Sequence, residues 1–388
     1  MSRDVVIIDA LRTPFTRAHK GALRNTRPDT LAAEVIKALL VRNPKIDPAK
    51  VEDVILGCAM PEAEQGMNVA RIAAILAGVP VEVPAMTINR FCSSGSQSIG
   101  LVADRVALGH IDLAIAGGTE SMTMIPMGGN KVAANPEIMA MHPETYTPMG
   151  TTAENVARLF EVSRADQDAF AYESHRRAVE AIERGYFSDE IATIEATVYT
   201  DNGPQTLSVS RDDGPRPDTS VESLSKLRPA FDPTGTITAG NASPLTDGAG
   251  AAIVASAELA RALELQPLGY FRRWVAAGVA PELMGIGPVP AIRKLLAQTG
   301  LTAADIDVFE INEAFAAQSV YCVRELGLDP AKVNPNGGAI ALGHPLGTSG
   351  ARMIATILRQ LKRTGGKYGV VSMCIGGGMG FACLVEAA

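Results

Sequence analysis

The order of strand-like and helix-like segments is repeated along the chain, and this repeat limits the possible folds more than any other feature. Apolar periodicity in the first part predicts strands at 4–10, 51–59 and 111–118, helices at 29–43, 68–78 and 98–109, and an extended segment at 83–92. The last part repeats the order, with strands at 268–278, 306–315, 368–374 and 380–386 and helices at 289–300, 316–326 and 351–365. Alternating strands and helices indicate an α/β fold with parallel sheets covered by helices.

A long insertion separates the two copies of the repeat. The second copy ends with two strands around a glycine-rich turn, whereas the returning strand of the first copy, GAGAAIVAS, comes only at 248–256. We therefore predict a first half at 1–120 completed by 246–265, an inserted domain at 121–245 and a second half at 266–388. The insertion contains one clear helix, at 163–185. An insertion of this length predicts a lid or a substrate-binding domain.

Charge and composition exclude several classes of protein. The 388 residues carry a formal net charge of −7, which gives no indication of nucleic-acid binding or of an anionic membrane partner. Hydrophobic residues make up 47% and charged residues 20%, as expected for a globular chain rather than a disordered one. No apolar run reaches the length of a membrane span, and MSRDVVIIDA has no signal-peptide pattern. We expect a cytoplasmic protein.

The cysteines are few, and no two of them form a close pair. There are five, an odd number, and no C-x-x-C pattern occurs. This usage argues against a disulfide framework and a zinc site and favours a reducing compartment. For Cys58, Cys322 and Cys383 we expect buried packing.

Four polar or nucleophilic side chains follow predicted strands in separate segments. Cys92 lies in NRFCSSGSQS at the start of a helix, where free N–H groups and the helix dipole stabilise a thiolate. His344 lies in GHPLG, Asn312 in INEAF and Cys374 just before IGGG. In open α/β sheets ligands bind beyond the strand ends, so we predict one site with the histidine lowering the thiol pKa further. For each residue taken singly another role remains open. Cys92 can be a core thiol and His344 a solvated turn histidine, while Asn312 can cap a helix and Cys374 can pack within a strand.

Several motifs in order resemble the thiolase family, of the acetyl-CoA acyltransferase (3-ketoacyl-CoA thiolase) type. They are NRFCSSGSQS at 89–98, GGTESM at 117–122, PMGTTAENVA at 148–157, LRPAF at 227–231, TAGNASPLTDGA at 238–249, MGIGP at 284–288, NEAFAAQ at 312–318, NGGAIALGHPLGTSGAR at 336–352 and CIGGGMG at 374–380. The resemblance covers essentially the whole chain. It implies the thiolase fold, in which two βαβαβαββ halves form a five-layered α-β-α-β-α core with an inserted loop domain.

The resemblance also implies roles for the residues of the site. Cys92 would carry the acyl group as nucleophile, and Cys374 would be the general acid and base. His344 and Asn312, through a water, would form one oxyanion hole. The backbone N–H groups of Cys92 and Gly376 would form a second, with glycine needed there for close approach of the backbone.

Coenzyme A is implied as a co-substrate, with no permanently bound cofactor and no metal. By motif match Arg216 and Ser223 would lie near the adenine and Ala239 and Ser243 along the pantetheine arm. The residues expected to pack the tunnel or lie near the substrate are Met149, Phe231, Met284 and Phe315. A solvated loop is the alternative for Arg216 and Ser223.

One departure within the family bears on the substrate. Biosynthetic acetoacetyl-CoA thiolases usually have histidine where this chain has Pro148, before Met149 and Gly150. Proline there resembles the degradative members, so we expect thiolysis of 3-ketoacyl-CoA in fatty acid β-oxidation. The alternatives are condensation of two acetyl-CoA, a synthase on the same fold and a non-catalytic acyl-CoA carrier. The resemblance further implies a homodimer or homotetramer, and it leaves open a multienzyme β-oxidation partner, the chain length and the physiological direction.

Overall fold

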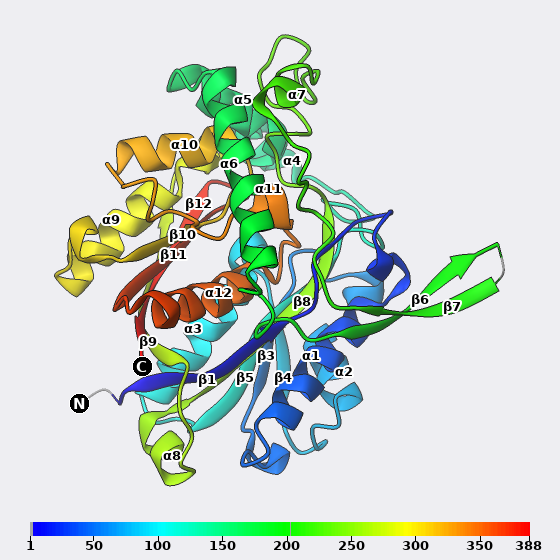
Figure 1. Ribbon diagram of the computed structural model, residues 1–388, viewed down its shortest axis with the longest axis vertical. Coiled ribbons are helices and arrows are strands. Elements are labelled where there is room, and N and C mark those ends of the chain that lie inside the picture. Colours follow the sequence, from blue (N-terminus) through cyan, green and yellow to red (C-terminus); the bar gives the residue numbers. More distant parts are fainter. Residues whose placement is uncertain (1–2, 202) are drawn as a thin grey trace.

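A single large sheet runs through the molecule and is built from two similar halves (Figure 1). The computed structural model describes residues 3–201 and 203–388. The strand order is β10-β11-β12-β9-β1-β8-β5-β3-β4, with β2 paired to β8. These strands are β1 (Val5–Arg12), β2 (Thr16–Arg17), β3 (Val54–Gly57), β4 (Ala85–Ile88), β5 (Leu113–Ser121), β8 (Thr246–Ser256), β9 (Gly269–Gly278), β10 (Val308–Ile311), β11 (Tyr368–Ile375) and β12 (Met379–Ala387).

The pairing directions differ in part from the predicted parallel sheets. Strands β3, β4 and β5 pair in parallel, as do β10 and β11. The central pairs β5–β8, β8–β1, β11–β12 and β12–β9 are antiparallel, because the chain returns beside β5 and β11 after each of those strands. The half-sheets join where β1 meets β9 through only two residue pairs, Val6 with Tyr270 and Ile7 with Gly269.

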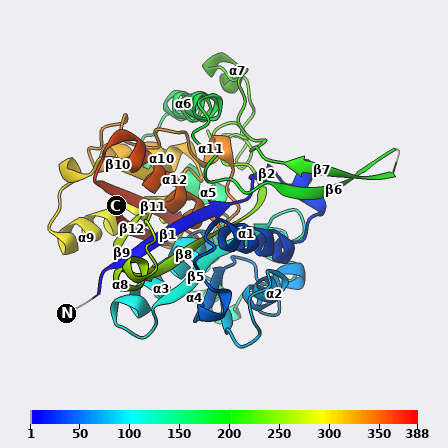
Figure 2. The same cartoon turned by 60° about the horizontal axis from the view of Figure 1, so that its bottom comes forward.

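Helices form three layers that alternate with the two half-sheets (Figures 1 and 2). α3 and α12 pack between the half-sheets, α1 and α2 cover the first half-sheet, and α9 and α10 cover the second. This arrangement confirms the predicted five-layered core. The helices of the two halves are α1 (Pro28–Arg42), α2 (Val69–Leu76), α3 (Ser94–Ala107), α8 (Ala257–Ala262), α9 (Pro288–Thr299), α10 (Ala316–Glu325), α11 (Ala339–Leu342) and α12 (Ser349–Thr364). Short 3₁₀ turns are η1 (Ala22–Asn25), η2 (Pro48–Lys50), η3 (Ala63–Gln65), η4 (Phe91–Ser93), η5 (Pro143–Tyr146), η6 (Pro281–Ile286) and η7 (Ala303–Asp305).

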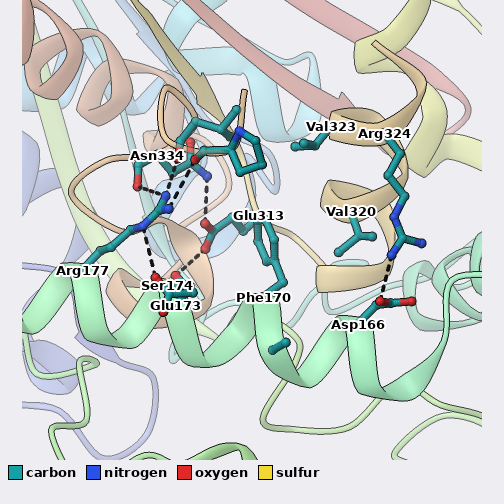
Figure 3. Close-up of a pocket in the computed structure, with 13 residues that line it drawn as sticks. Asp166, Phe170, Glu173, Ser174, Arg177, Glu313, Val320, Val323, Arg324 and Asn334 are labelled. Carbon is teal, nitrogen blue, oxygen red and sulfur yellow. Dashed lines mark hydrogen bonds and ion pairs between the residues drawn. The ribbon is translucent and has the colours of Figure 1, made fainter. Parts of the chain in front are cut away.

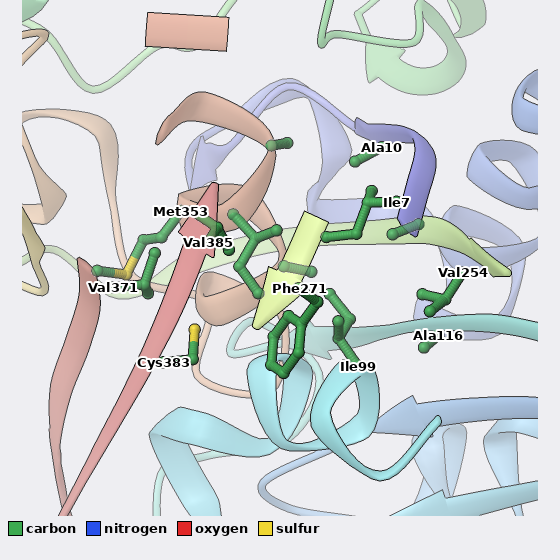
Figure 4. Packing of buried hydrophobic residues seen from close by; sticks show 14 of the residues in the cluster. Ile7, Ala10, Ile99, Ala116, Val254, Phe271, Met353, Val371, Cys383 and Val385 are labelled. Atoms are coloured by element: carbon green, nitrogen blue, oxygen red, sulfur yellow. The ribbon is translucent and has the colours of Figure 1, made fainter. Parts of the chain in front are cut away.

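The central helices carry the main core, part of which is shown in Figure 4. The apolar face predicted for α12 is fully buried and consists of Ile354, Ile357, Leu358 and Leu361. Burial of each such side chain contributes about 1.5–3 kcal/mol relative to exposure. Gly365, at φ 70°, ends the helix in the left-handed conformation that glycine adopts without strain.

The segment between β5 and β8 contains more structure than the sequence predicts. The expected helix is present as α6 (Arg164–Glu183), which begins with a capping box between Ser163 and Asp166. The elements not foreseen are α4 (Pro136–Met141), α5 (Met149–Leu159), α7 (Val221–Ser225) and a projecting hairpin of β6 (Ile194–Thr200) and β7 (Gly203–Val209). The division into three domains stays a prediction. Among the described residues no helix is long and apolar enough to cross a membrane.

Candidate active site

Cys92 lies in a strained turn between β4 and α3. It is the central residue of η4 and is 7% exposed. The preceding residue, Phe91, has φ 42°, a conformation that costs an aromatic residue energy and is typical of functional sites. The turn is held by Asn89 Oδ1, which accepts from Phe91 N at 2.8 Å, and by Ser94 Oγ, which donates to Phe91 O at 2.6 Å.

Cys374 and Gly376 come from the other half of the molecule to meet Cys92. Cys374 is fully buried near the end of β11, and negative charge on Cys92 raises its pKa further after burial, so the two thiols interact. The backbone N–H groups of Gly376 and of Cys92 itself lie near enough to the Cys92 sulfur to lower the pKa of the thiol. Two backbone donors therefore converge on the sulfur that would carry an acyl group.

His344 and Asn312 form a buried hydrogen-bonded pair. Asn312 Nδ2 lies 3.2 Å from His344 Nε2, and His344 Nδ1 lies 2.6 Å from Ser349 Oγ. Asn312 Oδ1 is buried and has no hydrogen-bond partner among the described residues. A buried acceptor without a protein partner is available to accept a hydrogen bond from a water or from a substrate group in the site.

The turn that carries His344 packs directly on the helix that follows Cys92. A Cβ on Gly95 would lie 2.8 Å from the carbonyl oxygen of Gly347, and one on Gly118 would lie 2.0 Å from the same atom. Only glycine allows this approach. The close packing joins the turn that carries His344 to the start of α3, the helix that follows Cys92.

The glycine requirement in IGGG differs from the expectation for Gly376. A Cβ on Gly376 would make ordinary contacts, the nearest at 3.5 Å to Met149 Sδ. The positions that need glycine are Gly377 and Gly378, with φ of 78° and 82°, and a Cβ on Gly378 would also meet Val279 O at 2.4 Å. The turn that requires glycine therefore lies at Gly377 and Gly378, directly after the proposed donor Gly376.

Burial changes the expected ionisation of the site. It raises the pKa of the Cys92 thiol to about 11, although the two backbone N–H groups oppose it. Burial lowers the pKa of His344 to about 3, with a smaller effect from the positive charge of Arg352. The prediction that Cys92 is a thiolate in the resting protein is therefore wrong. Loss of hydration on burial outweighs the stabilisation that a helix N-terminus gives a thiolate, so the Cys92 thiol and the His344 imidazole are both neutral at pH 7.

We expect the alkylation of Cys92 by iodoacetamide to follow this raised pKa. The thiolate is the reactive form, so the rate should rise about tenfold per pH unit from pH 7 to 9. Mass spectrometry of the peptide that contains Cys92 measures the rate, and the Cys92→Ala variant gives the background. A rate that levels off below pH 8 would mean that the thiolate already exists in the resting protein.

The residues predicted for the tunnel gather near Cys374, whereas those predicted for the adenine lie on the surface. Met284 and Phe315 are buried in one apolar cluster with Cys374, and Met149 packs against it. The ring of Phe231, half exposed, lies edge-on to Phe315 at 6.0 Å.

The four polar and small residues predicted to bind coenzyme A differ in what they already contact. Ser243 N donates to Ala314 O at 3.0 Å, and Ala239 is exposed. Arg216 is exposed and its side chain makes no ion pair within the described part of the chain. The hydroxyl of Ser223 already takes part in the capping box of α7.

Three supporting residues escaped sequence reasoning. Ser349 binds His344 as described above. Glu120, buried on β5, accepts from Ala59 N at 2.7 Å and from Gly347 N at 2.8 Å, which ties the His344 turn to the first half. A charged residue in the otherwise uncharged strand sequence LAIAGGTES is the signal that could have revealed it.

Glu313, the residue after Asn312, is buried and hydrogen-bonded to Ser174 and Asn334 (Figure 3). Its carboxylate accepts from Ser174 Oγ at 2.6 Å, Asn334 Nδ2 at 2.8 Å and Ile340 N at 3.1 Å. It borders a cavity of about 320 Å³ between α6 and α10. No cluster of metal-binding side chains occurs in residues 3–201 and 203–388.

Comparison with known proteins agrees with this geometry. The family models for the thiolase N-terminal domain and the thiolase C-terminal domain match residues 5–258 and 265–387. A 3-ketoacyl-CoA thiolase of Bacillus subtilis is 49% identical over 389 residues, covering 99% of each chain. A β-ketoadipyl-CoA thiolase of Pseudomonas aeruginosa is 48% identical over 406 residues, covering 100% of each. The dimeric peroxisomal thiolase of Saccharomyces cerevisiae has a TM-score of 0.91 at 42% identity, covering 100% of this chain and 98% of that one.

Fold and matches together define the class of protein, an acyltransferase that works on thioesters of coenzyme A. The chain belongs to the thiolase family.

Proposed function

We propose that this protein is a 3-ketoacyl-CoA thiolase, which cleaves a 3-ketoacyl-CoA with coenzyme A to acetyl-CoA and a shortened acyl-CoA. The observation that carries the proposal is the meeting of the Cys92 sulfur with two backbone N–H groups, beside a second buried thiol at Cys374. Such an arrangement suits a covalent acyl-enzyme whose oxyanion is held by fixed donors.

In the first half of the reaction the Cys92 sulfur attacks the 3-keto carbon, and its proton passes to His344. The bond between the α- and β-carbons breaks, which leaves the acyl group on Cys92 and an acetyl-CoA enolate. Cys374 gives its proton to the enolate carbon. Because His344 starts neutral, with a pKa of about 3, the developing negative charges nearby must favour its protonated form for the time of this step.

The second half returns every proton to its place. The Cys374 thiolate takes the proton of an incoming coenzyme A, whose sulfur then attacks the acyl carbon. The bond from Cys92 to the acyl carbon breaks, and His344 gives the first proton back to Cys92. The cycle is a two-step exchange with one covalent intermediate, and every step uses protein groups alone.

Two oxyanion holes are proposed around these steps. The N–H groups of Cys92 and Gly376 bind the oxygen of the tetrahedral intermediate. His344 and Asn312 bind the thioester oxygen of the enolate, with the unpaired Asn312 Oδ1 orienting a water. One such donor typically changes a rate by about 10²–10³.

The inserted segment is proposed to hold coenzyme A. Arg216, exposed and without an ion pair among the described residues, is suited to the phosphates near the adenine, with Ser223 beside it. Ala239 and Ser243 follow the pantetheine arm. The apolar cluster of Met149, Phe231, Met284 and Phe315 lines the way to Cys374.

The substrate is proposed to be longer than acetoacetyl-CoA. Pro148 and the names of relatives, 3-ketoacyl-CoA and β-ketoadipyl-CoA thiolases, support degradative cleavage over condensation. Condensation of two acetyl-CoA is the second candidate. A homodimer or homotetramer in the cytoplasm, acting in fatty acid β-oxidation alone or with a multienzyme partner, completes the proposal and is supported by a neighbour described as dimeric.

Thiolysis of three substrates tests the proposal. With purified protein and coenzyme A, we expect kcat/KM for a medium-chain 3-ketoacyl-CoA to exceed that for acetoacetyl-CoA by about tenfold or more, because each buried methylene adds binding in an apolar tunnel. Acetyl-CoA release is measured by mass spectrometry. Reaction with acetoacetyl-CoA alone would favour condensation, preference for β-ketoadipyl-CoA would favour a dicarboxylic substrate, and no reaction with any would refute thiolysis.

A further inference from the structure

A basic pocket lies at the end of α12 that is remote from the site. The helix starts at Ser349, which binds His344, and ends at Thr364, so the two ends lie about 24 Å apart at 1.5 Å per residue. The pocket has a volume of about 480 Å³. Its charged and aromatic lining consists of Arg42, Tyr186, Asp189, Arg359, Lys362 and Arg363.

Two of the four cations are fixed in orientation. Arg42 and Arg359 both pair with the carboxylate of Asp9. Both also donate to the backbone carbonyl of Asp189, at 2.7 and 3.0 Å. One carboxylate thus serves two guanidinium groups.

The other two cations have no carboxylate partner. Lys362 is exposed and its ammonium makes no hydrogen bond or ion pair within the described residues. Arg363 donates only to amide oxygens, those of Gln360 and Asn336, and its guanidinium lies 3.8 Å from the ring centre of Tyr186.

Helix electrostatics explain only part of this cluster. Cations in a last helical turn, such as Lys362 and Arg363, are favourable near the negative end of the dipole. That effect does not account for Arg42, which comes from α1, or for the hollow shape of the surface. Burial lowers the pKa of Arg359, the carboxylates of Glu190, Asp9 and Asp189 raise it, and the charge of Arg42 lowers it, so carboxylates already offset the charge of this arginine.

We propose that this pocket binds a phosphoryl dianion, either free phosphate or the phosphate of a small ester. Guanidinium forks and a lysine ammonium match tetrahedral phosphate oxygens, and a dianion would supply the anionic partner that Lys362 and Arg363 lack. The volume leaves room for an organic group beside the phosphate. Tyr186 and Asp189 of the lining belong to the inserted segment, but none of the residues predicted to bind coenzyme A lines the pocket, so the two sites are distinct.

Isothermal titration calorimetry of the full chain at low salt tests the proposal. The probes are inorganic phosphate, AMP and, as the uncharged comparison, adenosine. The variants are Lys362→Gln, which breaks no ion pair, and Lys50→Gln, an exposed lysine outside the pocket. We expect phosphate or AMP to bind, with affinity lowered about fivefold or more by Lys362→Gln and unchanged by Lys50→Gln.

The outcomes separate the sources of the phosphate. Equal affinity for phosphate and AMP means free phosphate, and tighter binding of AMP with none of adenosine means an ester. AMP binding that is lost in Arg216→Gln but kept in Lys362→Gln would place the ligand in the coenzyme A segment and overturn the proposal. Absence of binding at millimolar phosphate and AMP would overturn it as well.

Discussion

Replacing Cys92 with alanine should lower the rate of thiolysis by at least about 10³-fold, the largest effect expected of any single change in the site. The variant keeps the tunnel and the backbone donors but has no atom to carry the acyl group. Single-turnover experiments with radiolabelled 3-ketoacyl-CoA measure both the rate and the label attached to the protein. No label should remain on Cys92→Ala after denaturation.

A matched thiol separates chemistry from packing. Cys383 is fully buried on β12 in the central core. Its replacement by alanine also removes one sulfur atom, but at a position outside the site. Cys383→Ala should keep thiolysis within about threefold of the wild type and lose only stability. Comparable losses in both variants, or acyl label that persists without Cys92, would rule out Cys92 as nucleophile.

Replacing Arg12 with methionine should destabilise the fold by about 3–5 kcal/mol, the largest stability change expected of a single substitution. Arg12 Nη1 lies 2.6 Å from Asp212 Oδ1 and Nε lies 2.8 Å from Glu190 Oε1, and all three side chains are buried. Burial works against the Arg12 charge, but the two carboxylates outweigh it and raise its pKa. Methionine keeps much of the volume and leaves two buried carboxylates unpaired. Denaturant unfolding measures the loss.

Two further variants test whether buried, unpaired carboxylates cause the stability loss expected of Arg12→Met. The triple change Arg12→Met, Glu190→Gln and Asp212→Asn should recover part of the lost stability, because no buried charge is left unpaired. Arg176→Met removes an exposed arginine paired with Glu173 and Glu180 and should cost under about 1 kcal/mol. An equal loss for Arg176→Met and Arg12→Met would contradict the dominant role given to burial.

Local periodicity predicted most of the fold because the core helices follow it closely. α12 carries its isoleucines and leucines on one face, and strands and helices alternate in each half as the sequence predicted. α3 begins at Ser94, before the predicted start at residue 98, since its first turn has small polar residues that are buried by contact with distant segments, among them Gly57 and the Gly347 turn. The hairpin of β6 and β7 is mostly exposed, so no buried alternation marked it.

The site was predictable where chemistry follows a strand, and unpredictable where it depends on distant contacts. Cys92, Asn312 and Cys374 each follow or end a strand, whereas His344 follows the short helix α11 and not the strand that the sequence predicted. The hydrogen bond from Gly347 to Glu120 joins residues 227 positions apart, and no pattern along the chain encodes it. The pKa of Cys92 was mispredicted for the same reason, because desolvation depends on neighbours from both halves.

The position of β8 in the sheet has a consequence for synthesis in the cell. β8 separates β1 from β5, yet it is translated only after the whole segment 122–245. At about 5–20 residues per second, the ribosome leaves the edges of β1 and β5 unpaired for on the order of ten seconds. During that interval the nascent chain exposes the backbone donors and apolar faces through which unpaired strand edges aggregate.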